Sequence, residues 1–181
     1  MFKDESYIEE VGQLLRDLEK LTLSPVLVGG MALVILGSRR VTEDFDILIA
    51  KNNDLQEQIL SLFYSRGFEL ASKIDQQGTI LNTINNQKVA SIRMHLDKPS
   101  SAYFLKKKSG LRIDLLFDFP LPAVELAKRA QKKKIRSYTF YVAAREDLIR
   151  LKEIAVKNRS RSTDTQDLEF LQQLDKTETI S

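Results

Sequence analysis

Residues 26–49 constrain the fold more than any other part of the chain. Two short apolar runs in this segment have the length and composition of buried β-strands. A glycine pair, Gly29 and Gly30, closes the first run, and Asp44 and Asp46 lie two residues apart at the start of the second. Because side chains two apart in a strand point to one face, we expect these carboxylates to project together. The combination predicts a phosphate-binding glycine turn beside a pair of cation-binding acids.

A third acid, Asp114, lies within another apolar run, at residues 111–117. A carboxylate inside an apolar strand is costly to bury unless it is paired or bound to a metal ion. We therefore expect Asp44, Asp46 and Asp114 to hold Mg²⁺ or Mn²⁺, with nucleoside triphosphate oxygens completing the coordination. Asp118 is a weaker candidate than Asp114 because it adjoins a proline-rich break.

Each acid also has a structural explanation when it is considered alone. The alternatives are an edge or capping role for Asp44, an ion pair of Asp46 with Arg40, and an ion pair of Asp114 with Arg112. Arg40 can instead neutralise triphosphate charge, and Thr42 can position the strand that carries the acids. No G-x-G-x-x-G or G-x-x-x-x-G-K-[ST] motif is present to indicate another nucleotide-binding fold.

Apolar periodicity elsewhere predicts a mixed α/β (α+β) domain that ends in helices. The expected helices are Glu5–Lys20, Met31–Leu36, a helix capped by Asn53 or Asp54 and ending near Arg66, a helix opened by Pro120 and Pro122 that runs through Ala130, Arg145–Lys157 and Thr163–Leu174. The expected strands are Val26–Val28, Phe45–Ile49, Val89–Leu96 (with His95 at an alternating position), Leu111–Phe117 and Arg136–Val142. Residues 68–86 show no clear pattern. We expect residues 1–142 to form the core and residues 143–181 a helical segment packed on it.

Composition excludes several kinds of site. The 181 residues include no cysteine and one histidine, so thiolate metal sites, cysteine nucleophiles and multi-histidine sites are excluded. The sequence shows no apolar stretch long enough to span a bilayer, so we expect a cytoplasmic protein with no membrane partner. Residues 98–161 carry 17 Lys and Arg against 6 Asp and Glu. This basic segment is either a solvated surface or a region that attracts a polyanion such as RNA.

These motifs resemble the polymerase-beta-like nucleotidyltransferase superfamily. The superfamily pattern is a hydrophobic residue followed by G-[GS], then a [DE]-h-[DE] strand, then a third acid on a later strand. The matching segments are Val28-Gly29-Gly30, Asp44-Phe45-Asp46 and Ile113-Asp114. The longer run G-x-x-R-x-T-x-D-x-D, from Gly37 to Asp46, looks like the small unassigned branch. Gly30 replaces the serine of some members, which removes one expected hydroxyl contact.

The C-terminal segments E-D-L-I-R-L-K-E-I-A and R-S-R-S-T-D-T-Q-D-L are similar to abortive-infection (AbiEii-like) nucleotidyltransferase toxins. In that branch a helical lysine and a later aspartate support the site, and the matching positions here are Lys152 and either Asp164 or Asp167. The resemblance implies a twisted mixed sheet of the nucleotidyltransferase type flanked by helices.

The resemblance also implies Mg²⁺-dependent transfer of an NMP from an NTP to an acceptor hydroxyl, with release of pyrophosphate. Asp44, Asp46 and Asp114 would be the catalytic metal ligands. Gly29, Gly30, Arg40, Thr42 and Lys152 would contact the nucleotide. The acceptor would be an RNA, a protein or a small molecule, and a cognate antitoxin would be a further partner. The alternatives are a non-catalytic nucleotide- or nucleic-acid-binding regulatory module that retains the fold, and a plain nucleic-acid binder.

Overall fold

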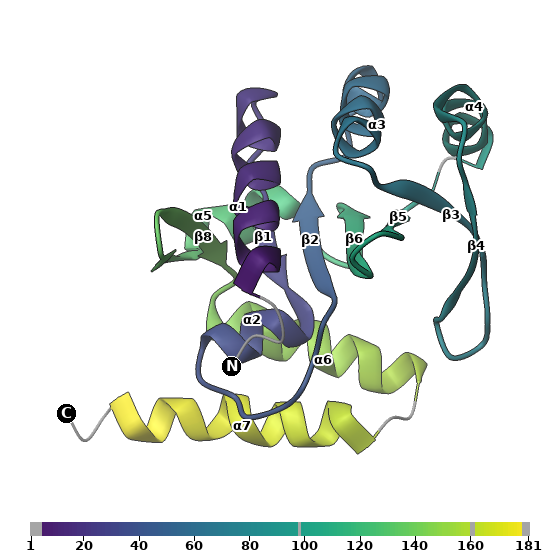
Figure 1. Cartoon of the computed structure of the whole chain (residues 1–181). Coiled ribbons are helices and arrows are strands. Elements are labelled where there is room, and N and C mark those ends of the chain that lie inside the picture. The colour runs from purple at the N-terminus through teal and green to yellow at the C-terminus, as the bar shows by residue number, and fades with distance from the viewer. Residues whose placement is uncertain (1–4, 98, 160–161, 179–181) are drawn as a thin grey trace.

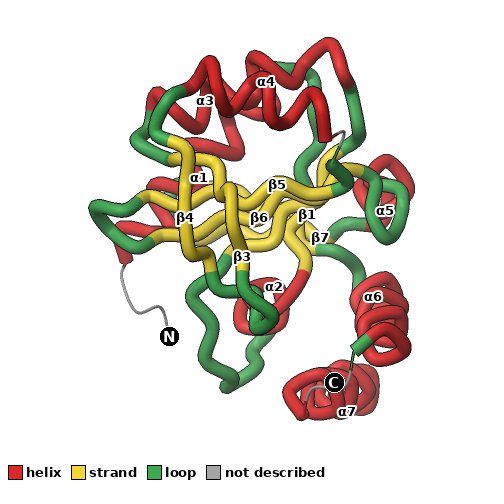
Figure 2. Tube along the Cα trace, turned by 90° about the vertical axis from the view of Figure 1, so that its right-hand side faces the viewer, coloured by secondary structure: helices red, strands yellow, loops and turns green. Residues whose placement is uncertain are grey.

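The computed structural model describes residues 5–97, 99–159 and 162–178. A single eight-stranded mixed sheet forms the centre of the molecule, with helices on both faces (Figures 1 and 2). The strands are β1 (Val26–Val28), β2 (Phe45–Ile49), β3 (Glu69–Ile74), β4 (Ile80–Ile84), β5 (Ser101–Lys106), β6 (Leu111–Phe117), β7 (Gln131–Ile135) and β8 (Tyr138–Val142). The helices are α1 (Glu5–Lys20), α2 (Gly29–Ile35), α3 (Gln56–Ser65), α4 (Gln87–Asp97), α5 (Ala123–Arg129), α6 (Arg145–Asn158) and α7 (Ser162–Glu178), with a 3₁₀ turn, η1 (Asn53–Leu55), before α3.

The strands are ordered β4-β3-β5-β6-β2-β1-β8-β7 across the sheet. The β2–β6 and β1–β8 pairs are parallel, and the other neighbouring pairs are antiparallel. The sheet therefore brings together strands that are distant in sequence. The mixed α/β fold expected from the sequence is confirmed.

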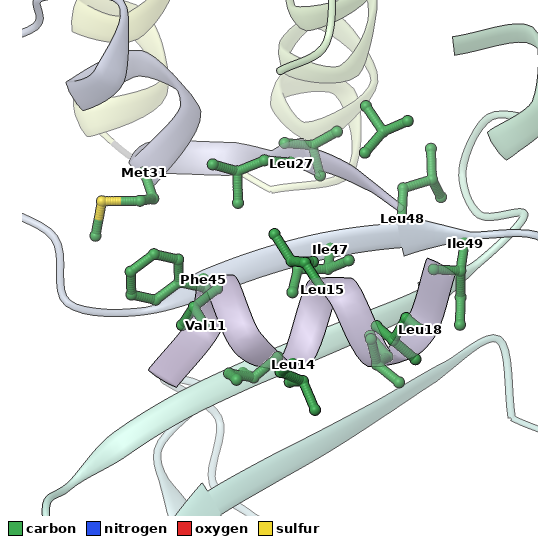
Figure 3. Close-up of a cluster of buried hydrophobic side chains, with 14 of the residues drawn as sticks. Val11, Leu14, Leu15, Leu18, Leu27, Met31, Phe45, Ile47, Leu48 and Ile49 are labelled. Atoms are coloured by element: carbon green, nitrogen blue, oxygen red, sulfur yellow. The ribbon is translucent and has the colours of Figure 1, made fainter. Parts of the chain in front are cut away.

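Helix α1 covers one face of the central strands. Its apolar stripe, which includes Leu14 and Leu18, is fully buried, as are Phe45, Ile47 and Ile49 of β2. Figure 3 shows these side chains in one cluster, with α1 lying across β2. Because side chains alternate along a strand, burial of the odd-numbered residues of β2 places the carboxylate of Asp46, between them, on the opposite face.

Most of the predicted elements are confirmed, with small shifts at their ends. Helix α1 and strands β1, β2 and β6 have the predicted limits. The predicted cap at Asn53 or Asp54 is shifted by one residue: Asn52 caps the 3₁₀ turn η1 that leads into α3, and its side chain accepts a hydrogen bond from the Asp54 backbone N–H. Strand β8 begins at Tyr138 rather than at Arg136, which lies in the preceding turn with φ of 57°.

The strand predicted over Val89–Leu96 is wrong, because this segment lies in α4. The side chain of Asn86 accepts hydrogen bonds from the backbone N–H groups of Lys88 and Val89, which favours a helix start. Ala90 and Met94, four residues apart, are buried on one side of the helix. His95 is an exposed helical residue and not part of a strand.

Four strands, β3, β4, β5 and β7, were not predicted. Residues 68–86, which show no clear pattern, form β3 and β4. The lysine-rich turn before β6 joins that strand to β5, and β7 pairs with β8 at the sheet edge. Strands β3, β4 and β7 contain many polar residues, which weakens the alternating pattern by which a strand is predicted.

The C-terminal helices lie against the rest of the chain. Leu148 of α6 and Leu171 of α7 are buried members of the main core cluster, and α7 contacts α2. The division of the chain into a core over residues 1–142 and a helical segment over residues 143–181 stays a prediction. Within the described ranges, no helix combines the length and apolar character needed to cross a bilayer.

Candidate functional site

Four neighbouring strands place the residues of the site in one row across the sheet. Val28 of β1 pairs with Asp46 of β2, Asp46 with Asp114 of β6, and Asp114 with Tyr103 of β5. Adjacent strands lie about 4.8 Å apart, so the two aspartates are direct neighbours. The row begins beside Gly29, where β1 turns into α2.

Gly29 and the Asp46 side chain are in close contact. Gly29 has a φ of 71°, and a Cβ built on it would lie 2.0 Å from Oδ2 of Asp46. A side chain at position 29 would therefore collide with the carboxylate. Glycine meets both requirements, the left-handed backbone and the close approach.

The adjacent carboxyl groups of Asp46 and Asp114 repel one another when both are ionised. Burial, followed by the charges of Asp114 and Asp44, raises the pKa of Asp46 to about 7. Burial also raises the pKa of Asp114, although Arg112 opposes this effect. The raised pKa values favour a proton held between the two carboxyl groups, and a divalent ion would relieve the same repulsion.

Arg112 makes the expected alternative contact with Asp114. Its Nε and Nη2 donate hydrogen bonds to Oδ1 and Oδ2 of Asp114 at 2.8 Å and 3.1 Å. The two residues are two positions apart on β6 and therefore share a face. The ion pair proposed as a structural explanation for Asp114 is thus present.

Asp44 precedes β2 at the exposed rim of the site. Its charge acts on both Asp46 and Asp114, so the three carboxyl groups share one electrostatic environment. Within the described part of the chain, however, no three acidic, histidine or cysteine side chains are already gathered closely enough to hold a metal ion. The residues fit a divalent cation through the Asp46–Asp114 pair, since an ionised carboxylate retains free lone pairs beside an arginine contact.

An open, largely polar cavity of about 800 Å³ surrounds these groups. All the predicted site residues line it. They are Gly29, Gly30, Arg40, Thr42, Asp44, Asp46, Asp114 and Lys152. The structure thus brings the predicted residues together, whereas their catalytic and binding roles stay predictions.

A buried ionic network joins the cavity to the C-terminal helices. Nζ of Lys152 lies 3.1 Å from Oδ1 of Asp164 and 2.7 Å from Oδ2 of Asp167. Arg159 donates hydrogen bonds to Asp164, and Arg40 pairs with Asp167. Burial acts to raise the pKa of Asp164, but the hydrogen bonds from Lys152 and Arg159 hold it below its ordinary value.

Arg40 lies over Gly30, because a Cβ on that glycine would be 2.9 Å from Cζ of Arg40. The guanidinium pairs with Asp167 of α7, so the alternative ion pair of Arg40 with Asp46 is wrong. The loop that carries Arg40 is therefore fixed by α7, a contact between residues 127 positions apart.

Other candidates lie outside the site. Asp118 accepts hydrogen bonds from the backbone N–H groups of Lys51 and Ala123, which is a structural role. Phe140 is fully buried in the core.

Sequence reasoning missed the far wall of the cavity. It is formed by residues 75–80, which are the turn between β3 and β4 with the first residue of β4, and by Tyr103 of β5. The Asp75 to Gly78 spacing is a turn signal, but neither neighbouring strand has a clear alternating pattern.

Solved structures of several nucleotidyltransferases have a similar fold. The lincosamide antibiotic adenylyltransferase LnuA, bound to lincomycin, is 11% identical with a TM-score of 0.58, over 94% of this chain and 98% of that chain. ANT(2'')-Ia in complex with adenylyl-2''-tobramycin is 10% identical with a TM-score of 0.57, over 92% of this chain and 87% of that one. An antigenic nucleotidyltransferase-like protein from Paracoccidioides brasiliensis is 18% identical with a TM-score of 0.56, over 94% and 77% of the two chains.

At these identities the structural matches show the fold alone. No curated protein matches the sequence. The family described as nucleotidyl transferase AbiEii toxin, type IV toxin–antitoxin system, matches residues 13–180. This match spans nearly the whole chain and includes the row of acids, the glycine turn and the C-terminal ionic network. The chain therefore belongs to the AbiEii family of nucleotidyltransferase toxins of type IV toxin–antitoxin systems.

Proposed function

We propose that this chain transfers a nucleoside monophosphate from an NTP to an acceptor hydroxyl and releases pyrophosphate. The observation that carries the proposal is the row of Gly29, Asp46 and Asp114 across adjacent strands in a polar cavity. Membership of the AbiEii family supports the reaction class.

Asp46 and Asp114, with Asp44 at the rim, would hold Mg²⁺ or Mn²⁺. A bound divalent cation supplies charge neutralisation for the triphosphate and the attacking oxygen. Asp114 would orient the acceptor hydroxyl and accept its proton as the acceptor oxygen bonds to the α-phosphorus. The bond from the α-phosphorus to the oxygen bridging to the β-phosphate breaks, and pyrophosphate leaves.

The glycine turn would hold the outer phosphates. Gly29 and Gly30 offer backbone N–H groups without side chains to block a phosphate's approach. The Lys152 charge acts on Asp46, and its ammonium is anchored by Asp164 and Asp167. Lys152 would neutralise charge on the leaving pyrophosphate, and Arg40 and Thr42 would border the same end of the nucleotide.

The finer assignments extend the family's description. We propose that the acceptor is an RNA, a protein or a small hydroxylated molecule, and that a cognate antitoxin opposes the activity in cells. A cytoplasmic location is part of this proposal.

A labelling experiment tests the function. The protein is incubated with each α-labelled NTP, Mg²⁺ or Mn²⁺, and total tRNA, lysate protein or small hydroxylated molecules, and mass analysis identifies the labelled product. Asp46→Ala should abolish both labelling and binding of the NTP–metal complex, whereas Asp54→Asn, on exposed η1, should retain both. Labelling by Asp46→Ala at the wild-type rate would refute the assignment.

The same experiment separates the two alternative functions. The bidentate contact of Arg112 with Asp114 is the observation that favours a non-catalytic module, because the arginine already contacts both oxygens of the third acid. Such a module would bind an NTP and label no acceptor. A plain nucleic-acid binder would retain salt-dependent RNA affinity after loss of the acids.

A further inference from the structure

The cavity continues beyond Asp114 toward β5 and the turn between β3 and β4. Tyr103, the cross-strand partner of Asp114, lies at this end of the row. Residues 75–80 form the adjoining wall, which we call the hairpin tip. Gly29, the proposed phosphate end, lies on the other side of Asp46.

The chemistry of phosphoryl transfer gives the two ends different roles. The attacking and leaving oxygens are roughly in line through the phosphorus atom. If pyrophosphate leaves toward Gly29, the acceptor hydroxyl must approach from the Asp114 side. We propose that the hairpin tip and Tyr103 form the acceptor subsite, and that Arg112 is the positioning residue that holds the tip beside Asp114. This inference rests on the proposed function.

The hairpin needs such support, because it leaves the sheet after a short pairing. Strand β3 pairs with β5 at Glu69 and Leu70, while β3 and β4 continue together to Ile74 and Ile80. Figure 1 shows this hairpin extending past the other strands toward the level of α6. Its turn therefore projects beyond the main sheet.

Arg112 connects the projecting tip to the row of acids. Its Nη1 donates a hydrogen bond to the backbone oxygen of Gly78, while Nε and Nη2 hold Asp114. Its guanidinium carbon also lies 5.1 Å from the centre of the Tyr103 ring. One side chain, 16% exposed, thus contacts the tip, the third acid and β5 together.

The tip is internally ordered and presents the neutral amides of Gln76 and Gln77 beside the carboxylate of Asp75. Oδ1 of Asp75 accepts hydrogen bonds from the backbone N–H groups of Gln77 and Thr79. The side chains of Gln76 and Gln77 are exposed, and among the described residues their amides make no hydrogen bond. An amide offers both donors and an acceptor, which suits hydroxyl groups.

The wall lacks a cation that is free to bind an acceptor phosphate. Among the described residues of this wall, Arg112 carries the positive charge, and Asp114 already takes two of its donors. The wall therefore suits the neutral, hydroxyl-bearing part of an acceptor, such as a sugar ring, recognised by hydrogen bonds.

The test separates acceptor binding from nucleotide binding. Total tRNA, casein and tobramycin are offered with labelled NTP and Mn²⁺, and the probe that the wild type labels is used for kinetics. The double variant Gln76→Ala/Gln77→Ala should raise the acceptor KM about tenfold, since each lost neutral hydrogen bond weakens binding roughly two- to tenfold. The KM for NTP should be unchanged, as should calorimetric binding of a non-hydrolysable α,β-methylene NTP with Mn²⁺. Gln58→Ala, an exposed glutamine on α3, is the matched control.

Arg112→Lys tests the positioning role, because lysine keeps the charge but not the three-way contact. Backbone hydrogen exchange at residues 75–80 should accelerate, and the acceptor KM should rise. In the double glutamine variant, a raised KM for NTP with an unchanged acceptor KM would overturn the subsite. In Arg112→Lys, an unchanged rate of backbone hydrogen exchange at residues 75–80 would overturn the positioning role. A wild type that labels no acceptor with any NTP would overturn the proposed function itself, and the subsite with it.

Discussion

Replacing Asp46 with asparagine should stabilise the ligand-free protein at alkaline pH while abolishing its activity. Burial and the neighbouring Asp114 and Asp44 raise the pKa of Asp46 from its ordinary value of 3.8 to about 7. The folded state therefore holds this proton more tightly than the unfolded state does. Ionisation of Asp46 leaves the free energy of unfolding unaffected below pH 3.8. This free energy then falls as pH rises toward 7 and stays reduced above pH 7.

The difference between a pKa of 3.8 in the unfolded state and about 7 in the folded state lowers the free energy of unfolding by about 4 kcal/mol at pH 8. At pH 5 the same relation gives a penalty of about 2 kcal/mol. Asparagine is neutral at every pH and resembles the protonated side chain in shape. The stability advantage of Asp46→Asn should therefore widen by about 2–3 kcal/mol between pH 5 and pH 8.

Urea unfolding in EDTA at the two pH values measures this difference. Asp54→Asn, an exposed aspartate on η1, controls for the general effect of removing a negative charge. A stability gap that stays constant from pH 5 to pH 8, or a less stable Asp46→Asn protein at pH 8, would refute the reasoning.

Adding Mn²⁺ provides the complementary measurement. An ion that binds only the folded state raises its stability in proportion to the logarithm of its concentration above Kd. The Tm of the wild type should rise with Mn²⁺ and NTP at pH 8, whereas that of Asp46→Asn should not. Equal shifts in both proteins would place the cation elsewhere.

Three further substitutions probe the site and its supports. Gly29→Ala places a Cβ 2.0 Å from Oδ2 of Asp46, so calorimetry should show NTP–Mn²⁺ binding weakened by about tenfold or more, with an unchanged circular dichroism spectrum. Gly12→Ala places a Cβ 2.4 Å from Cγ of Tyr138, and urea unfolding should show a loss of about 1–3 kcal/mol from overpacking; an unchanged midpoint would contradict the close packing of α1. Lys152→Met leaves two buried carboxylates short of a partner, and thermal unfolding at pH 7 should show a loss of roughly 3 kcal/mol, whereas full stability would mean that Arg40 and Arg159 suffice.

The sequence was most informative where apolar side chains are continuous. The buried runs of β2 and β6 and the stripe of α1 were predictable because each has one regular period. It was least informative at the polar edge of the sheet. A strand was expected over Val89–Leu96 in the segment that forms α4, yet Val89 and Ile92 are exposed. The Asn86 cap together with buried Ala90 and Met94 stabilises a helix.

Sequence by itself determined the local content of the site: two acids two residues apart, a third acid in an apolar run, and a glycine pair after the first strand. Of the two close acids, Asp46 lies in β2 and Asp44 precedes it, because the strand begins at Phe45. Alternation along strands and the low tolerance of apolar surroundings for charge make such inferences possible. Only the tertiary structure decided which groups meet. Strand order and register place Asp46 beside Asp114. Arg40 forms its ion pair with Asp167 of α7 rather than with Asp46, and the hairpin tip lies beside Arg112. These contacts join residues far apart in the chain, and their positions depend on how the whole sheet and its helices pack.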